Sequence, residues 1–129
     1  MIALDTNVLA RYLTQDDPDQ AQRATAIMDG LTVSSPGFVA TIVWAELHWV
    51  LTRAYGFAPR EVVERISDLA LADEIRPEEP AAIAGAVSAA RKGADFADAL
   101  IGEAATAVGC DAIVTFDKRA AAKLGWRLA

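Results

Sequence analysis

Apolar and polar residues follow one another in blocks that predict short strands separated by amphipathic helices. Short apolar runs predict strands at residues 2–4, 31–34, 74–76, 112–115 and 126–128. Longer segments with apolar residues at helical spacing predict helices at residues 7–13, 18–28, 40–55, 59–70, 80–93, 96–108 and 118–124. This alternation predicts an α/β sandwich with a mostly parallel sheet, in which functional sites form beyond the carboxyl ends of strands.

Length and composition narrow the class of protein. With 129 residues, 53% of them hydrophobic, the chain can bury one sizeable core, so we expect a single domain spanning residues 1–129. No uncharged apolar run reaches the roughly 18 residues that a membrane-spanning helix needs, and no cationic segment precedes Asp5, so we expect neither a membrane protein nor a secretory signal. The lone Cys110 is typical of a reducing compartment, which predicts a cytoplasmic protein.

Four carboxylates occupy positions where the pattern expects apolar or turn residues: the end of the first strand, two apolar helices and the end of a late strand. They are Asp5, Glu46, Asp98 and Asp117. Gathered within ~4 Å, like charges would repel by roughly 4 kcal/mol per pair at an effective dielectric near 20. Such a cluster requires bound cations or raised pKa values. Because neither a cysteine cluster nor several histidines are available, the oxygen ligands favour Mg²⁺ or Mn²⁺.

Each carboxylate also has an ordinary structural interpretation. Asp5, Asp95 and Asp117 each precede a predicted helix, where an aspartate often caps the free backbone N–H groups. Asp98 would then be the third helical residue behind Asp95, although its apolar neighbours favour an inward position for Asp98 over Asp95. For Glu46, which has no basic partner on its turn, the alternative is a solvated helix edge.

The charge balance leaves nucleic acid open as a substrate. The net charge of −6 argues against a polyanion held by bulk charge alone. Without the four candidate ligands, however, 14 acidic residues face 12 basic ones, and several basic residues follow Asp117 directly. Arg11, Lys118 and Arg119 are candidates for phosphate contacts, with solvated surface charge as the alternative for each.

The acidic segments resemble the ordered motifs of PIN domains. The matching segments are LDTNVL at residues 4–9, AEL at 45–47, DFADALI at 95–101 and VTFD at 114–117. The length of the chain further resembles the VapC-type toxins of bacterial toxin–antitoxin modules. The resemblance implies a three-layer α/β sandwich with Mg²⁺- or Mn²⁺-dependent ribonuclease activity and an antitoxin partner. It assigns the metal ligands to Asp5, Glu46, Asp98 and Asp117, and leaves the part played by Asp95 open.

The expected chemistry is hydrolysis of a phosphodiester bond of RNA. A bound metal ion lowers the pKa of its water from ~15.7 toward neutrality, which supplies a hydroxide nucleophile without any nucleophilic side chain. Thr6, Asn7 and Thr115 could orient the ligands as neighbouring hydrogen-bond donors, or be ordinary turn and strand-end residues.

Three other functions share part of this pattern. A phosphatase of the haloacid-dehalogenase type also begins with an aspartate after a short strand, but it normally has a second aspartate where this chain has Asn7. A Mg²⁺-binding receiver domain pairs acids at its first strand and keeps a lysine at a late strand end, and neither is clear here. A non-catalytic PIN-like binding domain would have lost some of the four acids.

The helix predicted at residues 40–55 is apolar nearly all round and carries Trp44 and Trp49. Such a helix is buried, or its outer side is covered by a partner, for which a homodimer and an antitoxin are both candidates. An antitoxin could also place an arginine or lysine among the four acids. We expect His48, which has no catalytic neighbours in the sequence, on the surface of this helix.

Overall fold

The computed structural model describes residues 1–129 and contains two separate parallel sheets. The first has the order β1-β2-β3, formed by Ile2–Ala3, Gly37–Val39 and Ile75–Pro77. The second pairs β4 (Val114–Thr115) with β5 (Arg127–Leu128). All strand pairs are parallel, and the α/β fold class predicted from the sequence is confirmed.

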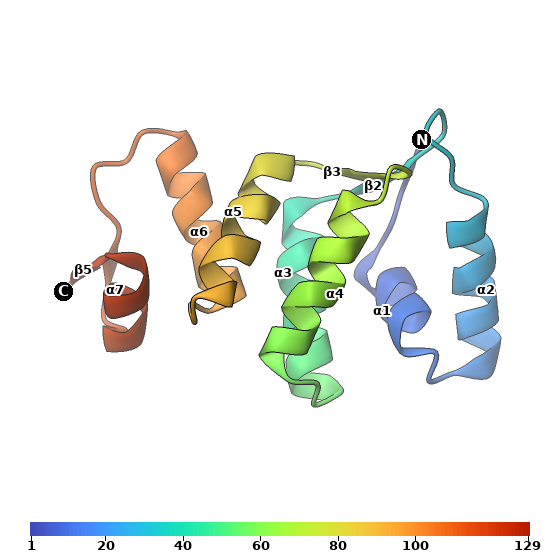
Figure 1. Ribbon diagram of the computed structural model, residues 1–129, viewed down its shortest axis with the longest axis horizontal. Helices are drawn as coiled ribbons and strands as arrows, with labels where there is room; N and C mark the ends of the chain where they lie inside the picture. The colour runs from blue at the N-terminus through green and yellow to red at the C-terminus, as the bar shows by residue number, and fades with distance from the viewer.

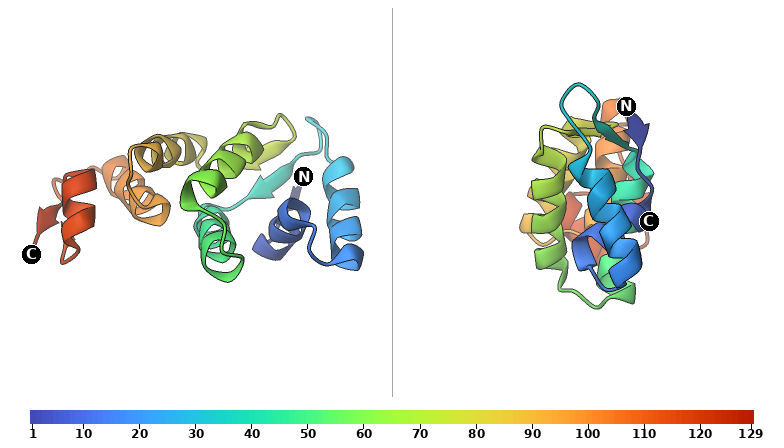
Figure 2. Two further views of the ribbon diagram at one scale, coloured as in Figure 1. Left: turned by 60° about the horizontal axis from the view of Figure 1, so that its bottom comes forward. Right: turned by 90° about the vertical axis from the view of Figure 1, so that its right-hand side faces the viewer.

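Helices make every connection between the strands. The first sheet is linked by α1 (Thr6–Thr14), α2 (Pro18–Asp29), α3 (Thr41–Trp49), η1 (Val50–Ala54) and α4 (Pro59–Leu71). The two sheets are joined through α5 (Pro80–Arg91) and α6 (Phe96–Ala107), and α7 (Lys118–Leu124) links β4 to β5. The helices stand in a row from α2 at one end to α7 at the other, with α5 and α6 between the sheets (Figures 1 and 2). None of them combines the length and apolar composition that crossing a bilayer requires.

Several helices begin at the residues predicted from the sequence. Three helices begin at a proline, as predicted, because the ring fixes a helical φ and the missing N–H has no partner at that position. At α2 the side chain of Asp17 accepts a hydrogen bond from the backbone N–H of Gln20 at 3.0 Å. At the other end of the chain, Gly125 ends α7 with a φ of 70°, a conformation that glycine adopts without steric penalty.

The core is a single cluster of 19 buried apolar residues centred on α3. Trp44, Leu47 and Leu51 are buried there, which confirms that this helix belongs to the core. Each such side chain contributes about 1.5–3 kcal/mol by leaving water. His48 is buried too, only 7% exposed, so the predicted surface position is wrong. The sequence did not reveal the side of α3 that faces the core.

The second strand lies later than expected. Residues 31–34 form no strand; instead the backbone N–H groups of Thr32 and Ser35 each bond to the other residue's carbonyl in a tight loop. The strand begins at Gly37 instead. A Cβ added at Gly37 would lie 2.7 Å from Cδ1 of Leu4. Glycine is therefore required because the buried side chain of Leu4, which directly follows β1, packs against this position.

The helix predicted at residues 40–55 changes its winding halfway. Residues 50–54 form the π-helical turn η1, and the N–H of Tyr55 bonds to the carbonyl of Val50 at 3.2 Å. Thr52 donates from its hydroxyl to the carbonyl of His48 at 2.8 Å within the same turn. Turns of this kind occur often at functional sites, and this one carries Arg53.

Candidate functional site

An acidic groove lies where the ends of α3, α6 and α7 meet. Its volume is about 370 Å³, and Asp95, Asp98 and Asp117 all line it. Trp49 and Arg53 line it from the side of α3 and η1, and the basic side chains of Arg119 and Lys123 line it from α7. We call it the acidic groove after its three aspartates. Two of the four predicted carboxylates, which lie 19 residues apart in the sequence, are thus brought to one place.

The start of α6 positions Asp98. The side chain of Asp95 accepts a hydrogen bond from the N–H of Asp98 at 2.9 Å, so Asp95 is the helix cap that the sequence suggested. Asp98 is half-buried and Asp95 exposed, as their neighbours in the sequence indicated. Burial, reinforced by the negative charges of Asp95 and Asp117, raises the pKa of Asp98 above its ordinary value. A bound cation or a basic group would relieve this cost.

Asp117 both caps a helix and faces the groove. Its Oδ1 accepts hydrogen bonds from the backbone N–H groups of Arg119 at 2.9 Å and Ala120 at 3.0 Å. The hydroxyl of Thr115 accepts a hydrogen bond from the N–H of Asp117 at 3.0 Å. Thr115 thus holds Asp117 by accepting a hydrogen bond, whereas we expected Thr115 to donate one. Because capping uses only Oδ1, capping and ligand binding are compatible at Asp117.

Asp5 and Glu46 lie outside this groove. Asp5 follows β1 and is exposed, and its side chain caps no helix, so the capping interpretation is wrong for this residue. Glu46 is exposed on the side of α3 that also carries Ile42 and Trp49. Next to Asp5, the hydroxyl of Thr6 is buried without a hydrogen-bond partner. A buried hydroxyl normally has a hydrogen-bond partner. The structure provides none for the hydroxyl of Thr6.

The four carboxylates have the right chemistry for a hard divalent ion but do not form one site within this chain. No group of three or more His, Cys, Asp or Glu residues is placed to hold a metal ion. The structure pairs Asp98 with Asp117 and leaves Asp5 and Glu46 apart from them. Their joint role as metal ligands stays a prediction.

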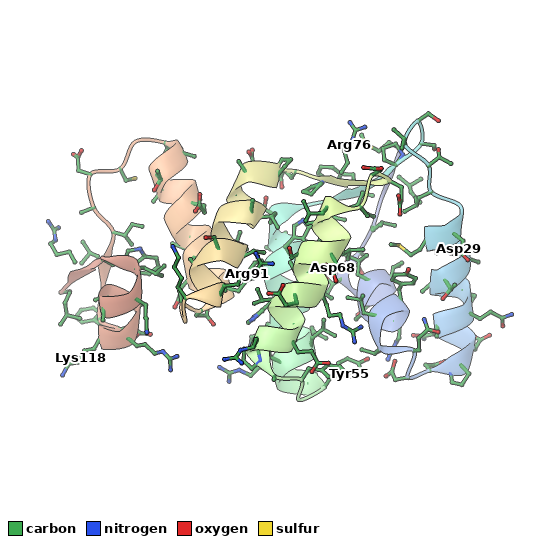
Figure 3. The ribbon with its side chains drawn as sticks, in the orientation of Figure 1. Asp29, Tyr55, Asp68, Arg76, Arg91 and Lys118 are labelled. Atoms are coloured by element: carbon green, nitrogen blue, oxygen red, sulfur yellow. The ribbon has the colours of Figure 1, made fainter.

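A second groove adjoins the acidic one and is lined by arginines. It has a volume of about 570 Å³, and Arg53, Arg60 and Arg119 line it. Arg91 lines it as well, but Glu64 of α4 neutralises it through bonds of 2.8 and 2.9 Å (Figure 3). Both grooves include Arg53, Arg119 and Asp95, so they are continuous.

Sequence reasoning identified only one of these three arginines. Arg119 was a predicted phosphate contact and does line the groove, whereas Lys118 projects from the outer end of α7 (Figure 3). Arg53 and Arg60 were missed. No local pattern in the sequence connects Arg53 or Arg60 to the four carboxylates.

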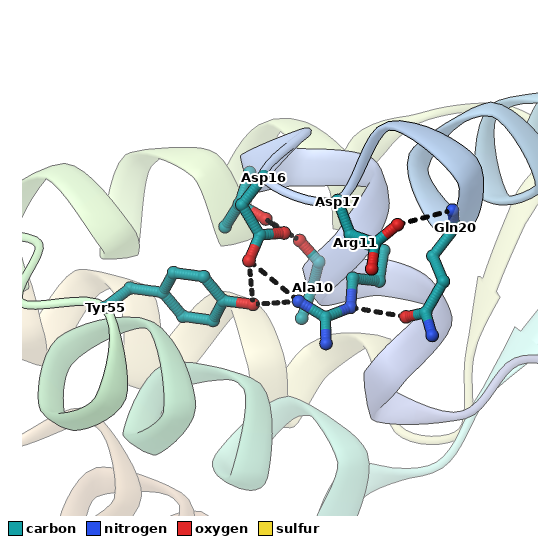
Figure 4. Close-up of polar contacts among 7 residues, drawn as sticks. Ala10, Arg11, Asp16, Asp17, Gln20 and Tyr55 are labelled. Carbon is teal, nitrogen blue, oxygen red and sulfur yellow. Dashed lines mark hydrogen bonds and ion pairs between the residues drawn. The ribbon is translucent and has the colours of Figure 1, made fainter.

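Arg11 is committed to a structural network rather than to the grooves. Its guanidinium donates to Asp16 and to the hydroxyl of Tyr55, both at 2.7 Å, and its Nε donates to Gln20 at 2.7 Å (Figure 4). The network ties α1 to the end of η1. The prediction that Arg11 contacts phosphate is therefore not supported, because its Nε and Nη1 already donate to other side chains.

Comparison with known proteins identifies the family. No curated protein matches the chain, but the model of the PIN domain family matches residues 2–125. The match includes all four acidic segments quoted above. PIN domains are generally nucleases that use a divalent metal ion, usually Mg²⁺. The chain belongs to the PIN domain family.

Proposed function

We propose that this protein is an endoribonuclease dependent on Mg²⁺ or Mn²⁺. The observation that supports this best is the half-buried Asp98, whose pKa is raised beside Asp95 and Asp117, at the end of a groove lined by unpaired arginines. A phosphatase of the haloacid-dehalogenase type and a receiver domain are not favoured, because the PIN match runs through all four acidic segments.

The two grooves suit a polyanion that must be held next to carboxylates. Arg53, Arg60 and Arg119 can bind backbone phosphates without reading the bases. Carboxylates at the other end would repel a phosphate unless a cation lies between them. In this arrangement the arginines bind the RNA and the carboxylates hold the ion. With a net charge of −6, binding depends on this local positive region.

We further propose that the nuclease is the VapC-type toxin of a toxin–antitoxin module in the cytoplasm. The order and spacing of the acidic segments support this assignment. The antitoxin would cover the exposed side of α3, where Ile42 and Trp49 flank Glu46. Trp44 and Leu51, which belong to the core, are not available to it. An arginine or lysine of the antitoxin would enter the acidic groove and lower the repulsion there.

Cleavage of a single-stranded RNA by the purified protein tests the nuclease. We expect cleavage with Mg²⁺ or Mn²⁺, none in EDTA, and a loss of at least tenfold in Asp98→Asn. The metal-free Asp98→Asn variant should be no less stable than the wild type, because the folded state disfavours the ionised carboxylate. Asp29→Asn, an exposed acid at the end of α2, is the matched control and should cleave normally (Figure 3). Full activity in EDTA would exclude the metal-dependent mechanism.

Expression in cells tests the toxin. We expect growth arrest when the chain is expressed alone, and none for Asp98→Asn. The wild type and Asp98→Asn differ by one side chain and are compared at equal protein level. Unaltered growth with the wild type would contradict the toxin assignment but not the proposed nuclease activity.

A further inference from the structure

Two exposed aromatic side chains flank Arg53 along the continuous groove. Trp49, the last residue of α3, lines the acidic groove and is 59% exposed. Phe57, three residues beyond η1, lines the groove of the arginines, which we call the arginine groove, and is 38% exposed. Arg53 lines both grooves and is separated from each ring by four positions along the chain. A cationic side chain thus lies where the two grooves join, with one aromatic ring on either side.

The backbone and a neighbouring ring fix the position of Phe57. Its N–H bonds to the carbonyl of Leu51 at 3.0 Å, and Gly56 turns the chain just before it with a φ of 73°. Its ring stacks on that of Tyr55, with centroids 6.2 Å apart and planes inclined by 14°. The hydroxyl of Tyr55 in turn donates to Asp16 at 2.9 Å (Figure 4). A ring held in this way loses little freedom when a ligand covers it.

The surroundings of Trp49 favour a nucleotide over an apolar protein segment. Ile42 is 76% exposed on the same side of α3 but lines neither groove, so cover by the proposed antitoxin accounts for this side chain. Trp49 instead shares its groove with Arg53 and Arg119. An aromatic ring beside cationic groups complements a flat base that is joined to a phosphate. The antitoxin would also cover Trp49 and would then exclude the RNA from it.

We propose that Trp49 and Phe57 each stack on an unpaired base of the RNA, while Arg53 binds a phosphate of the strand that links these bases. Proteins hold single strands by this combination of basic groups on the backbone and aromatic rings on the bases. Because every base has a π face, the two rings select unpaired bases without selecting a base sequence. The inference rests on the proposed function and adds the residues that recognise the substrate.

An RNA strand without bases tests the stacking. Asp98→Asn protein is titrated with a single-stranded RNA oligonucleotide and with an abasic oligonucleotide of the same length, whose sugar–phosphate backbone carries no bases. We expect the abasic strand to bind about tenfold more weakly, because it keeps the phosphate contacts and loses the stacking. Equal affinity for the two strands at the same salt concentration would overturn the proposal.

Substitutions of the rings identify the stacking residues. In the same protein, Trp49→Leu and Phe57→Leu should each weaken binding of the RNA about tenfold, whereas Trp49→Tyr and Phe57→Tyr keep a ring and should retain most of the affinity. Neither leucine variant should weaken binding of the abasic strand, a difference that a loss of folding would not produce. Leucine variants that bind the RNA as tightly as the parent protein would overturn the assignment of the two rings.

Tryptophan fluorescence reports on the contact at Trp49 directly. A base stacked on the indole should quench its fluorescence, so RNA should quench the parent protein, and the abasic strand should not. Trp49→Leu should abolish this quenching although Trp44 and Trp126 remain. Trp126→Phe, which removes a tryptophan outside both grooves, is the matched control and should leave quenching and affinity unchanged. Quenching that persists in Trp49→Leu would contradict the contact.

The outcomes separate this inference from the proposed function. If the wild type does not cleave RNA but these differences between the two strands are found, the proposed nuclease fails and the stacking stands. Cleavage by the wild type together with equal binding of the two strands would overturn the stacking alone.

Discussion

The imidazole of His48 stacks on the ring of Phe96, with ring centroids 5.2 Å apart and planes inclined by 28°. Both rings are buried. The contact joins α3 to the first residue of α6, so it fixes the helix that carries Glu46 against the start of the helix that carries Asp98. A histidine without a catalytic partner thus positions two candidate ligands.

His48 should make stability depend on pH in the weakly acidic range. Burial lowers its pKa from an ordinary value near 6.5, and the charge of Asp95 only partly opposes this. The unfolded chain therefore binds a proton more readily, so stability is complete above about pH 6.5 and falls as the pH drops below it. His48→Phe should show a smaller decrease in Tm between pH 7.5 and 5.5.

Thermal denaturation of the two proteins at both pH values measures the effect. Because His48 is the sole histidine of the chain, no other imidazole contributes. Equal decreases in Tm for wild type and variant would show that His48 is not the cause.

Arg53→Gln and Arg60→Gln should weaken RNA binding to a similar degree for all RNA sequences. Each should also lower the slope of log K against log salt by about 0.7, the value for one contact to a single strand. Fluorescence anisotropy with Asp98→Asn protein measures binding without cleavage. Arg23→Gln is the control, since Arg23 lies on α2 and pairs with Asp19 at 3.0 Å. An unchanged salt slope in both groove variants would remove the arginines from the RNA path.

Substitutions of Asp117 should separate its two roles. Asp117→Asn retains a good capping group for α7, whereas Asp117→Ala removes the bonds to the backbone of Arg119 and Ala120 and should cost about 1 kcal/mol. Both variants should lose cleavage. Chemical denaturation measures the stability of the two variants, and the RNA assay measures their activity. An active Asp117→Asn protein would show that Asp117 only caps the helix.

The network of Arg11, Asp16 and Tyr55 should affect stability at acidic pH and leave cleavage unchanged. Hydrogen bonds from Thr14, Arg11 and Tyr55 lower the pKa of Asp16 to about 2. The stabilisation is therefore present above the ordinary carboxyl pKa of about 4 and is lost as the pH falls toward 2. Arg11→Gln should lower the Tm at pH 6 and flatten its decrease below pH 4. Weaker RNA cleavage by this variant would restore the role in phosphate binding that its hydrogen bonds argue against.

The sequence by itself determined the features that depend on neighbouring residues. Prolines and capping aspartates specify where helices begin, because the partners lie within four residues, as for Asp17 with Gln20 and Asp95 with Asp98. The order of the acidic segments was enough to indicate the PIN family. The inward position of Asp98 could also be predicted, because the apolar residues that determine it lie beside it in the sequence.

Only the tertiary structure decided the features that depend on residues far apart. His48 is buried because Phe96, 48 residues later, packs on it, and position 37 requires glycine because Leu4 leaves no room for a Cβ. Arg53, Arg60 and Arg119 share a groove although no local pattern connects them. The separation of Asp5 from Asp117 likewise follows from the path of the chain between the two sheets. The hydrophobic effect is not directional and acts between residues at any separation along the sequence. Which apolar residues pack together is therefore decided only in the folded chain.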